Sequence, residues 1–194
     1  MCIRDRFIAG AGVQWLRDKI RLIDNAYETE KIAKSKKNSK GVYVVPAFTG
    51  LGAPYWNSKS RGLITGLTRD SDWRDLVRAT IESVAYQTSD LFLSMRKDGL
   101  NPKSVKVDGG MVSNNWFVQF LSEILKIKIT RSKINETTAL GAAYMAGYQT
   151  GIYRSLSDIK QNWKKDRDFK PKFNKSYRNK LLQGWQQAIK KTLA

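Results

Sequence analysis

The sequence predicts a globular α/β domain built in layers, and three observations lead to this fold class. Segments with apolar residues at helical spacing alternate along the chain with short strand-like runs. The 194 residues are 41% hydrophobic, which is enough for one core of ordinary size. No segment approaches the roughly 18 consecutive apolar residues of a membrane span, and the N-terminus lacks the apolar stretch of a signal peptide. We therefore expect a cytoplasmic protein.

Two strands are predicted in the first half of the chain. The run GVYVVPAF (41–48) places Val42, Val44 and Val45 at buried strand positions. The following stretch, TGLGAPYWNSKSRG (49–62), is rich in turn-forming residues, and LITGL (63–67) predicts a second short strand.

The clearest helix is predicted over residues 71–95. Asp70 or Ser71 can serve as its N-cap, and the sequence KDGLNP (97–102) ends it. The apolar residues at helical spacing are Leu76, Val77, Ile81, Val84, Ala85, Leu91, Phe92 and Met95.

A strand, a turn and a helix are predicted next. In SVKVD the residues Val105 and Val107 share one face of a short strand, and two glycines follow. Ser113 or Asn114 can cap the helix after the glycines. That helix should bury Phe117, Phe120, Leu121 and Ile124. The run IKIT (127–130) predicts another strand.

Two further helices are predicted towards the C-terminus. The segment 135–151 is rich in small residues that would let a neighbouring backbone approach closely: Gly141, Ala142, Ala143, Ala146 and Gly147. The helix over 177–193 should pack back on the body through Leu181, Leu182, Trp185, Ile189 and Leu193. We interpret residues 156–194 as a basic helical extension of the same domain.

The charge is strongly positive, with 35 Lys and Arg against 17 Asp and Glu, a net +18. Much of the excess lies in residues 31–40 and 164–180, which we interpret as solvated basic loops; a nucleic-acid-binding surface is the alternative. The single cysteine, Cys2, cannot form an internal disulfide, and the absence of histidine excludes a zinc site of the usual Cys and His type. Catalysis would have to use carboxylates, hydroxyls, lysines or backbone dipoles.

The paired glycines Gly109 and Gly110 stand where a predicted strand ends and a helix begins. Glycine can adopt positive φ, and the missing Cβ atoms let an anionic or flat ligand approach the backbone amides and the helix N-terminus. The pair is neither a Walker A loop nor the three-glycine dinucleotide fingerprint. On the residues alone, a nucleotide site and a plain turn both stay open.

Several motifs together resemble one known family. They occur in order from Phe7 to the tail: FIAGAGVQWLRD, GVYVVPAFTGLGAPYW, RGLITGLTR, RATIESVAYQT, VDGGMVSNNWFVQF and TTALGAAYMAG. Their order and spacing resemble the C-terminal part of the FGGY carbohydrate kinases, and GLGAPYW with VDGGMVSNN is similar to the glycerol kinase branch. The resemblance implies an actin-like ATPase fold of ribonuclease-H-like type, in which two such domains face each other across a cleft.

The resemblance also implies a nucleotide site in this chain. Gly10, Gln14, Gly110 and Asn114 match family positions that line the site for ATP with Mg²⁺. The two glycines would permit close backbone approach, while the amides of Gln14 and Asn114 could donate and accept hydrogen bonds. Two simpler roles stay open, Asn114 as a helix cap and Gln14 as a solvent-facing residue. Gly109 is expected to shape the turn.

The resemblance further implies that chemistry depends on parts outside this chain. In the family the catalytic base and the main glycerol contacts belong to the N-terminal domain, so we expect no catalytic or metal-ligating residue here. The first strands of the C-terminal domain should precede Phe7, and residues 1–6 match nothing in the family. We expect an incomplete kinase domain over 7–155 and a homo-oligomer in the complete enzyme. The chain alone should be inactive.

Overall fold

The computed structural model describes residues 8–134 and 136–194. The expectations for Cys2 and for residues 1–6 as foreign sequence lie outside the described residues. Within the described residues no helix is both long and apolar enough to span a lipid bilayer.

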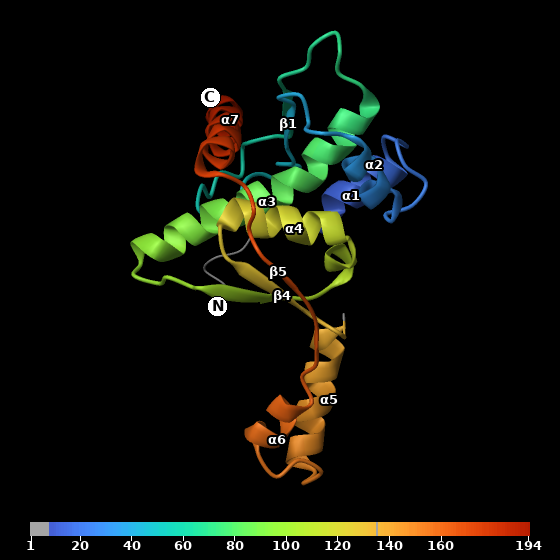
Figure 1. The fold of residues 1–194 in the computed structure, drawn as a ribbon, viewed down its shortest axis with the longest axis vertical. Helices are drawn as coiled ribbons and strands as arrows, with labels where there is room; N and C mark the ends of the chain where they lie inside the picture. The colour runs from blue at the N-terminus through green and yellow to red at the C-terminus, as the bar shows by residue number, and fades with distance from the viewer. Residues whose placement is uncertain (1–7, 135) are drawn as a thin grey trace.

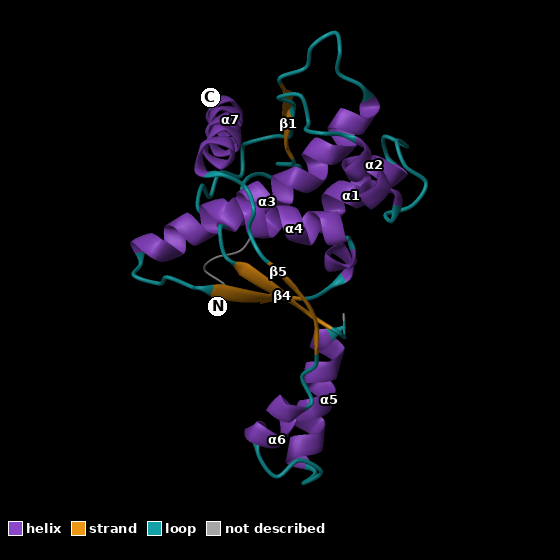
Figure 2. Cartoon of the chain, viewed as in Figure 1, coloured by secondary structure: helices purple, strands orange, loops and turns teal. Residues whose placement is uncertain are grey.

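The body is an α/β arrangement in which two long helices cover a three-stranded sheet (Figures 1 and 2). The helices are α3 (Trp73–Lys97) and α4 (Asn115–Leu125), and the strands are β3 (Ser104–Val107), β4 (Lys128–Ser132) and β5 (Lys165–Phe169). β3 runs parallel to β4, with Val105 opposite Ile129, and β5 runs antiparallel to β4. Both strands predicted in this region are confirmed, although β4 is shifted towards Ser132.

A second, two-stranded sheet lies on the other side of α3. β1 (Tyr43–Val45) pairs antiparallel with β2 (Leu63–Thr65), which confirms both predicted strands. Val42, Val44 and Val45 are buried, as expected, because α3 packs directly against β1. The N-terminal helices α1 (Gly10–Asp18) and α2 (Glu28–Ser35) also pack against α3. α3 is thus the central element of the fold.

The core forms where α3, α4, the sheet and the C-terminal helix α7 (Lys175–Leu193) meet. Tyr86 stands at its centre, with ring centroids 5.4 Å from Trp185 and 5.6 Å from Phe120. All four apolar residues predicted to be buried in α4 are buried: Phe117, Phe120, Leu121 and Ile124. Burying aromatic rings of this size contributes strongly to the stability of a domain.

The caps of the two central helices differ in how well they were predicted. Asn114 is the N-cap of α4, and its side chain accepts a hydrogen bond from the Phe117 amide at 2.8 Å. For α3 the prediction of Asp70 or Ser71 is wrong. Asp72 caps α3 in a reciprocal capping box with Asp75, because an aspartate three residues later can return the hydrogen bond.

The basic segments are more ordered than predicted. The expected loop over 31–40 is wrong in its first half, which belongs to α2, and the expected loop over 164–180 contains β5 and the start of α7. Each of these elements buries an apolar side: Ile32 and Ala33 in α2, and Phe169 in β5. The lysines lie on the opposite, exposed faces. Because lysines dominate the composition of both segments, the few apolar residues that mark the buried sides are not evident from composition.

Helices α5 (Thr137–Gln149) and α6 (Leu156–Gln161) form an arm that extends away from the body (Figure 1). The expectation that small residues admit a neighbouring backbone is not met here. Ala142, Ala143 and Ala146 are exposed, and no atom lies within 4 Å of a Cβ built on Gly141. Gly147 alone among the small residues of α5 is buried, and the Tyr153 ring packs against it.

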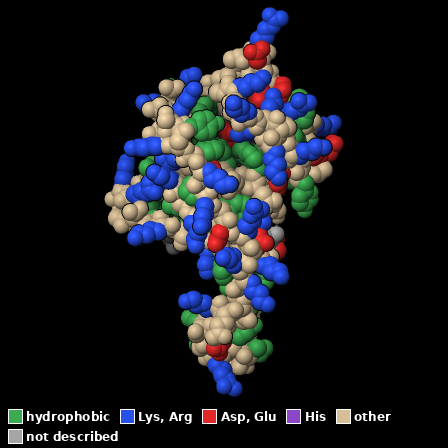
Figure 3. Space-filling model, in the orientation of Figure 1, with side chains coloured by type: hydrophobic (Ala, Val, Ile, Leu, Met, Phe, Trp, Pro, Cys, Tyr) green, Lys and Arg blue, Asp and Glu red, His purple; other side chains and the backbone are tan. Residues whose placement is uncertain are grey.

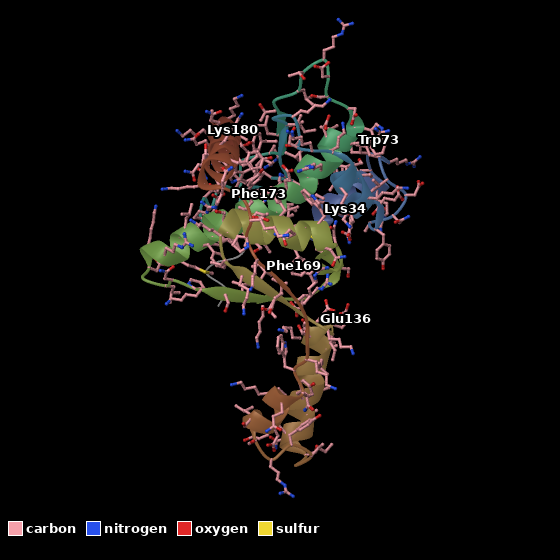
Figure 4. The ribbon with its side chains drawn as sticks, in the orientation of Figure 1. Lys34, Trp73, Glu136, Phe169, Phe173 and Lys180 are labelled. Atoms are coloured by element: carbon pink, nitrogen blue, oxygen red, sulfur yellow. The ribbon has the colours of Figure 1, made fainter. Side chains whose placement is uncertain are left out.

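The tail packs back on the body, as predicted. Trp185 and Ile189 of α7 are fully buried, and Leu181 and Leu182 pack against the core. Leu193 is 40% exposed, so the predicted contact does not extend to the last turn. Figure 4 marks Phe173 and Lys180 where the chain returns from β5 and enters α7.

Candidate functional site

A cavity of about 860 Å³ opens between α1, α2 and the turn that leads into α4. Its lining includes all four residues that the sequence analysis singled out: Gly10, Gln14, Gly110 and Asn114. These residues come from two segments about 100 positions apart in the sequence. A concave site of this volume is large enough for a small organic ligand.

The first wall of the cavity is α1. Val13 and Leu16 are buried and hold this helix on α3, which leaves Gln14 on the exposed side facing the cavity. Gly10 opens the helix, and a Cβ built there would lie 3.8 Å from the Met111 side chain. α1 and the glycine turn are therefore neighbours at the base of the site.

The glycine turn forms the second wall. Gly109 has φ of 89°, a left-handed conformation that favours glycine, and this confirms its role as the residue that shapes the turn. Gly110 starts the short 3₁₀ helix η1 (Gly110–Ser113), and no atom lies within 4 Å of a Cβ built on it. From behind, the Arg131 guanidinium donates to the Val112 carbonyl at 2.7 Å. The backbone at Gly110 is thus accessible to a ligand, and the hydrogen bond from Arg131 stabilises the η1 turn to which Gly110 belongs.

Asn114 is largely engaged within the protein. Its Oδ1 accepts from the Phe117 amide, and its Nδ2 donates to the Thr29 hydroxyl at 3.1 Å. The cap role left open by the sequence is therefore present. Because an amide NH₂ group carries two hydrogens and one is donated to Thr29, the Asn114 side chain has at most one N–H left to donate to a ligand.

The third wall was missed by the sequence analysis. It consists of the start of α2 and the loop before it: Asn25, Ala26, Tyr27, Thr29, Glu30, Lys31 and Lys34. A helix-start signal was present, since Asn25 is followed by Glu28, whose carboxylate accepts from the Asn25 amide at 2.9 Å. This asparagine and glutamate spacing could have located α2 within the basic segment.

Glu30 and Lys34 of the third wall form an ion pair. Glu30 accepts hydrogen bonds from Lys34 and from both the backbone and side-chain nitrogens of Asn115. Desolvation opposes ionisation of Glu30, but these hydrogen bonds outweigh it and lower the pKa of the carboxyl. Figure 4 shows Lys34 on α2 close to the end of α4. No cluster of three or more His, Cys, Asp or Glu suited to a metal ion occurs among the described residues.

A buried ion pair supports α2 from the α3 side. Arg78 contacts Glu82 at 2.7 Å, and it also donates to the Ala33 and Lys36 carbonyls at the C-terminal end of α2. The guanidinium lies 4.7 Å from the centre of the Trp116 ring. Burial raises the pKa of the Glu82 carboxyl, against the charge and hydrogen bonds of Arg78.

The fold and the cavity together define an α/β domain with a concave site large enough for a small molecule. Residues 6–150 match the FGGY family of carbohydrate kinases, C-terminal domain, and the chain belongs to this family. The prediction of an actin-like ATPase fold is confirmed by this match and by the structural neighbours.

Among curated relatives, the chain is 53% identical to glycerol kinase 1 of Pseudomonas aeruginosa over 185 residues, and 48% identical to the glycerol kinase of Alkaliphilus oremlandii over 188 residues. These alignments cover 95% and 96% of this chain. The chain spans 37% of the length of each relative.

Solved structures agree with this assignment. A crystal structure of Plasmodium falciparum glycerol kinase with ADP superposes with a TM-score of 0.85 at 39% identity, covering 95% of this chain and 37% of that one. A xylulose kinase from Lactobacillus acidophilus has the same fold, with a TM-score of 0.76 at 22% identity and coverage of 93% and 37%.

Proposed function

We propose that this chain forms the ATP-binding part of a glycerol kinase, which transfers the γ-phosphoryl group of ATP to glycerol and gives glycerol 3-phosphate. The main support is that Gly10, Gln14, Gly110 and Asn114 line one cavity. The glycerol kinases among the relatives, one of them solved with ADP, support the choice of nucleotide and acceptor.

The lining of the cavity suits a nucleotide. Val13, Ile81 and Met111 supply apolar surface for a planar base. Gly110 leaves the backbone accessible to the ribose or phosphates, and the Gln14 amide can donate and accept there. Mg²⁺ would enter with ATP, because this ion keeps most of its water and is held largely by substrate phosphates.

Phosphoryl transfer depends on an acceptor hydroxyl held in line with the γ-phosphoryl group. We assign acceptor binding and proton removal to the part of the longer relatives that this chain does not span. The purified 194-residue chain should therefore bind nucleotide without turning over ATP and glycerol. Measurable formation of glycerol 3-phosphate by this chain would contradict that assignment.

Gly110→Val tests the nucleotide site directly. A Cβ at Gly110 meets no atom within 4 Å, so the variant should fold, yet it places two methyl groups where the ligand would approach. We expect ADP affinity, measured by titration calorimetry, to fall at least about tenfold, or about 1.4 kcal/mol.

Gly141→Val is the matched control, because Gly141 also has open space but lies on α5, away from the cavity. It should leave ADP affinity unchanged. Equal ADP affinity in Gly110→Val and the unaltered chain would rule out Gly110 as a ligand-facing position.

Two alternatives have distinct tests. Another FGGY kinase acting on a different polyol or sugar would be identified by a panel of acceptors on the complete enzyme. If the chain instead binds nucleic acid through its basic residues, its affinity for nucleic acid should fall steeply as the salt concentration rises, and ATP should not change it. Lys and Arg are spread over the visible face of body and arm without a single dense patch (Figure 3), so we favour the kinase.

We also propose a cytoplasmic homo-oligomer for the complete enzyme.

A further inference from the structure

We propose that Glu30 is a positioning residue of the nucleotide cavity, which sets the distance between α2 and the glycine turn. This inference rests on the proposed function, because it concerns how the same cavity binds its ligand. Glu30 would act through α4, without direct contact with the nucleotide.

The contacts of Glu30 cross from α2 to the first residue of α4. Its Oε2 accepts from the Asn115 backbone N–H at 3.0 Å, and its Oε1 accepts from the Asn115 side-chain amide at 3.3 Å. The first amides of a helix have no partner within the helix, and the positive end of the helix dipole favours a carboxylate there. Lys34, one turn along α2, holds the same carboxylate.

A second link runs beside the first. The Asn114 side chain donates to the Thr29 hydroxyl at 3.1 Å, and that hydroxyl donates to the Ala26 carbonyl at 2.7 Å. Adjacent residues of α2 are therefore joined to adjacent residues at the start of α4, across 85 positions of sequence. Two parallel links resist rotation as well as separation of the helices.

The position of this junction ties it to the cavity. Thr29, Glu30 and Asn114 all line the cavity, and η1 with Gly110 directly precedes the linked end of α4. Arg78 holds the opposite end of α2 through the Ala33 and Lys36 carbonyls. With its C-terminal end fixed and the Glu30 link removed, the start of α2 keeps the Thr29 link to Asn114 but can rotate about it relative to η1, which changes the width of the cavity.

The experiment compares two carboxylates that both accept from backbone amides around α4. Glu30→Ala removes the junction at the cavity. Glu123→Ala is the control, because Glu123 is buried near the other end of α4, where it accepts from the Phe173 amide at 2.7 Å. For each variant of the 194-residue chain, ADP affinity is measured by calorimetry and the thermal midpoint is measured without ligand.

We expect Glu30→Ala to weaken ADP binding roughly tenfold, because substitutions that touch no ligand can change the coupling to a site by this order through packed and hydrogen-bonded neighbours. Glu30→Gln should restore most of the affinity, because its amide oxygen can still accept from the Asn115 N–H. Glu123→Ala should lower the thermal midpoint while leaving ADP affinity within about twofold. If Glu30→Ala does not fold, Glu30→Asp carries the same test, since its shorter side chain withdraws from Asn115.

The outcomes separate the two proposals. If the unaltered chain binds no ADP, the proposed nucleotide site itself fails. If the unaltered chain binds ADP and Glu30→Ala, or its substitute Glu30→Asp, binds equally well, the positioning role of Glu30 is wrong. The role is equally wrong if Glu123→Ala loses as much affinity as the Glu30 variant, because the loss would then follow general destabilisation.

Discussion

Asp90 gives the sharpest test of how burial of a carboxyl group affects the stability of this fold. It lies on α3, and its carboxyl group is hydrogen-bonded to two residues of α7. It is 3% exposed, and its oxygens accept from the Trp185 indole nitrogen at 2.7 Å and the Gln186 amide at 2.8 Å. Burial outweighs these hydrogen bonds and raises the pKa of Asp90 from 3.8 to about 6.

The sign of the pH dependence follows from this direction. The folded protein keeps the proton up to a pH of about 6, whereas the unfolded chain releases it near 3.8. The contribution of Asp90 to stability is therefore fully present below pH 3.8 and is lost as the pH rises through about 6. The difference between the two pKa values corresponds to about 3 kcal/mol.

Asp90→Asn removes this titration. The amide can accept through one oxygen only, so the variant also loses one hydrogen bond at a cost of about 1–3 kcal/mol that does not change with pH. The informative quantity is therefore the change with pH of the difference in unfolding free energy between the unaltered protein and Asp90→Asn. Between pH 4 and pH 7 the unaltered protein should lose about 2 kcal/mol relative to Asp90→Asn, because a small part of the full difference is already lost at pH 4.

Denaturant unfolding at several pH values, followed by tryptophan fluorescence, measures both free energies. The remaining carboxyl groups titrate in both proteins and cancel in the difference. Parallel stability curves between pH 4 and pH 7 would show that Asp90 is ionised in the folded state at acidic pH, and the argument from burial would fail.

Two further variants test the packing by denaturant unfolding. Gly184→Ala would press a methyl group into the Tyr43 hydroxyl, and we expect a loss of about 1–3 kcal/mol; an unchanged free energy of unfolding would show that the Tyr43 ring moves aside without cost. Arg78→Met leaves the Glu82 carboxylate buried without its ion-pair partner, so we expect a loss of about 3–5 kcal/mol; a loss below 1 kcal/mol would contradict the account of this pair.

The sequence predicted those elements whose apolar pattern is strong. The period of α3 and the alternation in β3 placed both elements correctly, and the glycine pair with Asn114 located the turn at the cavity. These signals are local, because one stretch of chain carries both the apolar face and the residues that end it.

Prediction from the sequence was wrong or incomplete in two situations. Charged residues can outnumber the apolar residues of a helix, and a contact can join residues that are far apart in the sequence. α2 has only a narrow apolar side, with Ile32 and Ala33 among lysines and glutamates, so the pattern of this segment favours a loop. The contact between Glu30 and Asn115 joins residues 85 positions apart, and neither residue type signals it. The third wall of the cavity was therefore absent from the prediction, although its Asn25 and Glu28 helix-start signal was present.

The arm formed by α5 and α6 affects how the unfolding of this chain should be measured. Gly147 is the one buried residue in α5, and α6 has none, so little apolar surface ties these helices to the body. Regions with few buried contacts open at a lower free energy than the core. Circular dichroism would sum the arm and the body, whereas tryptophan fluorescence reports mainly on the body, because none of the six tryptophans lies in α5 or α6. Lack of coincidence between the two signals would then reflect two cooperative units within one chain, and a single unfolding free energy would describe the body alone.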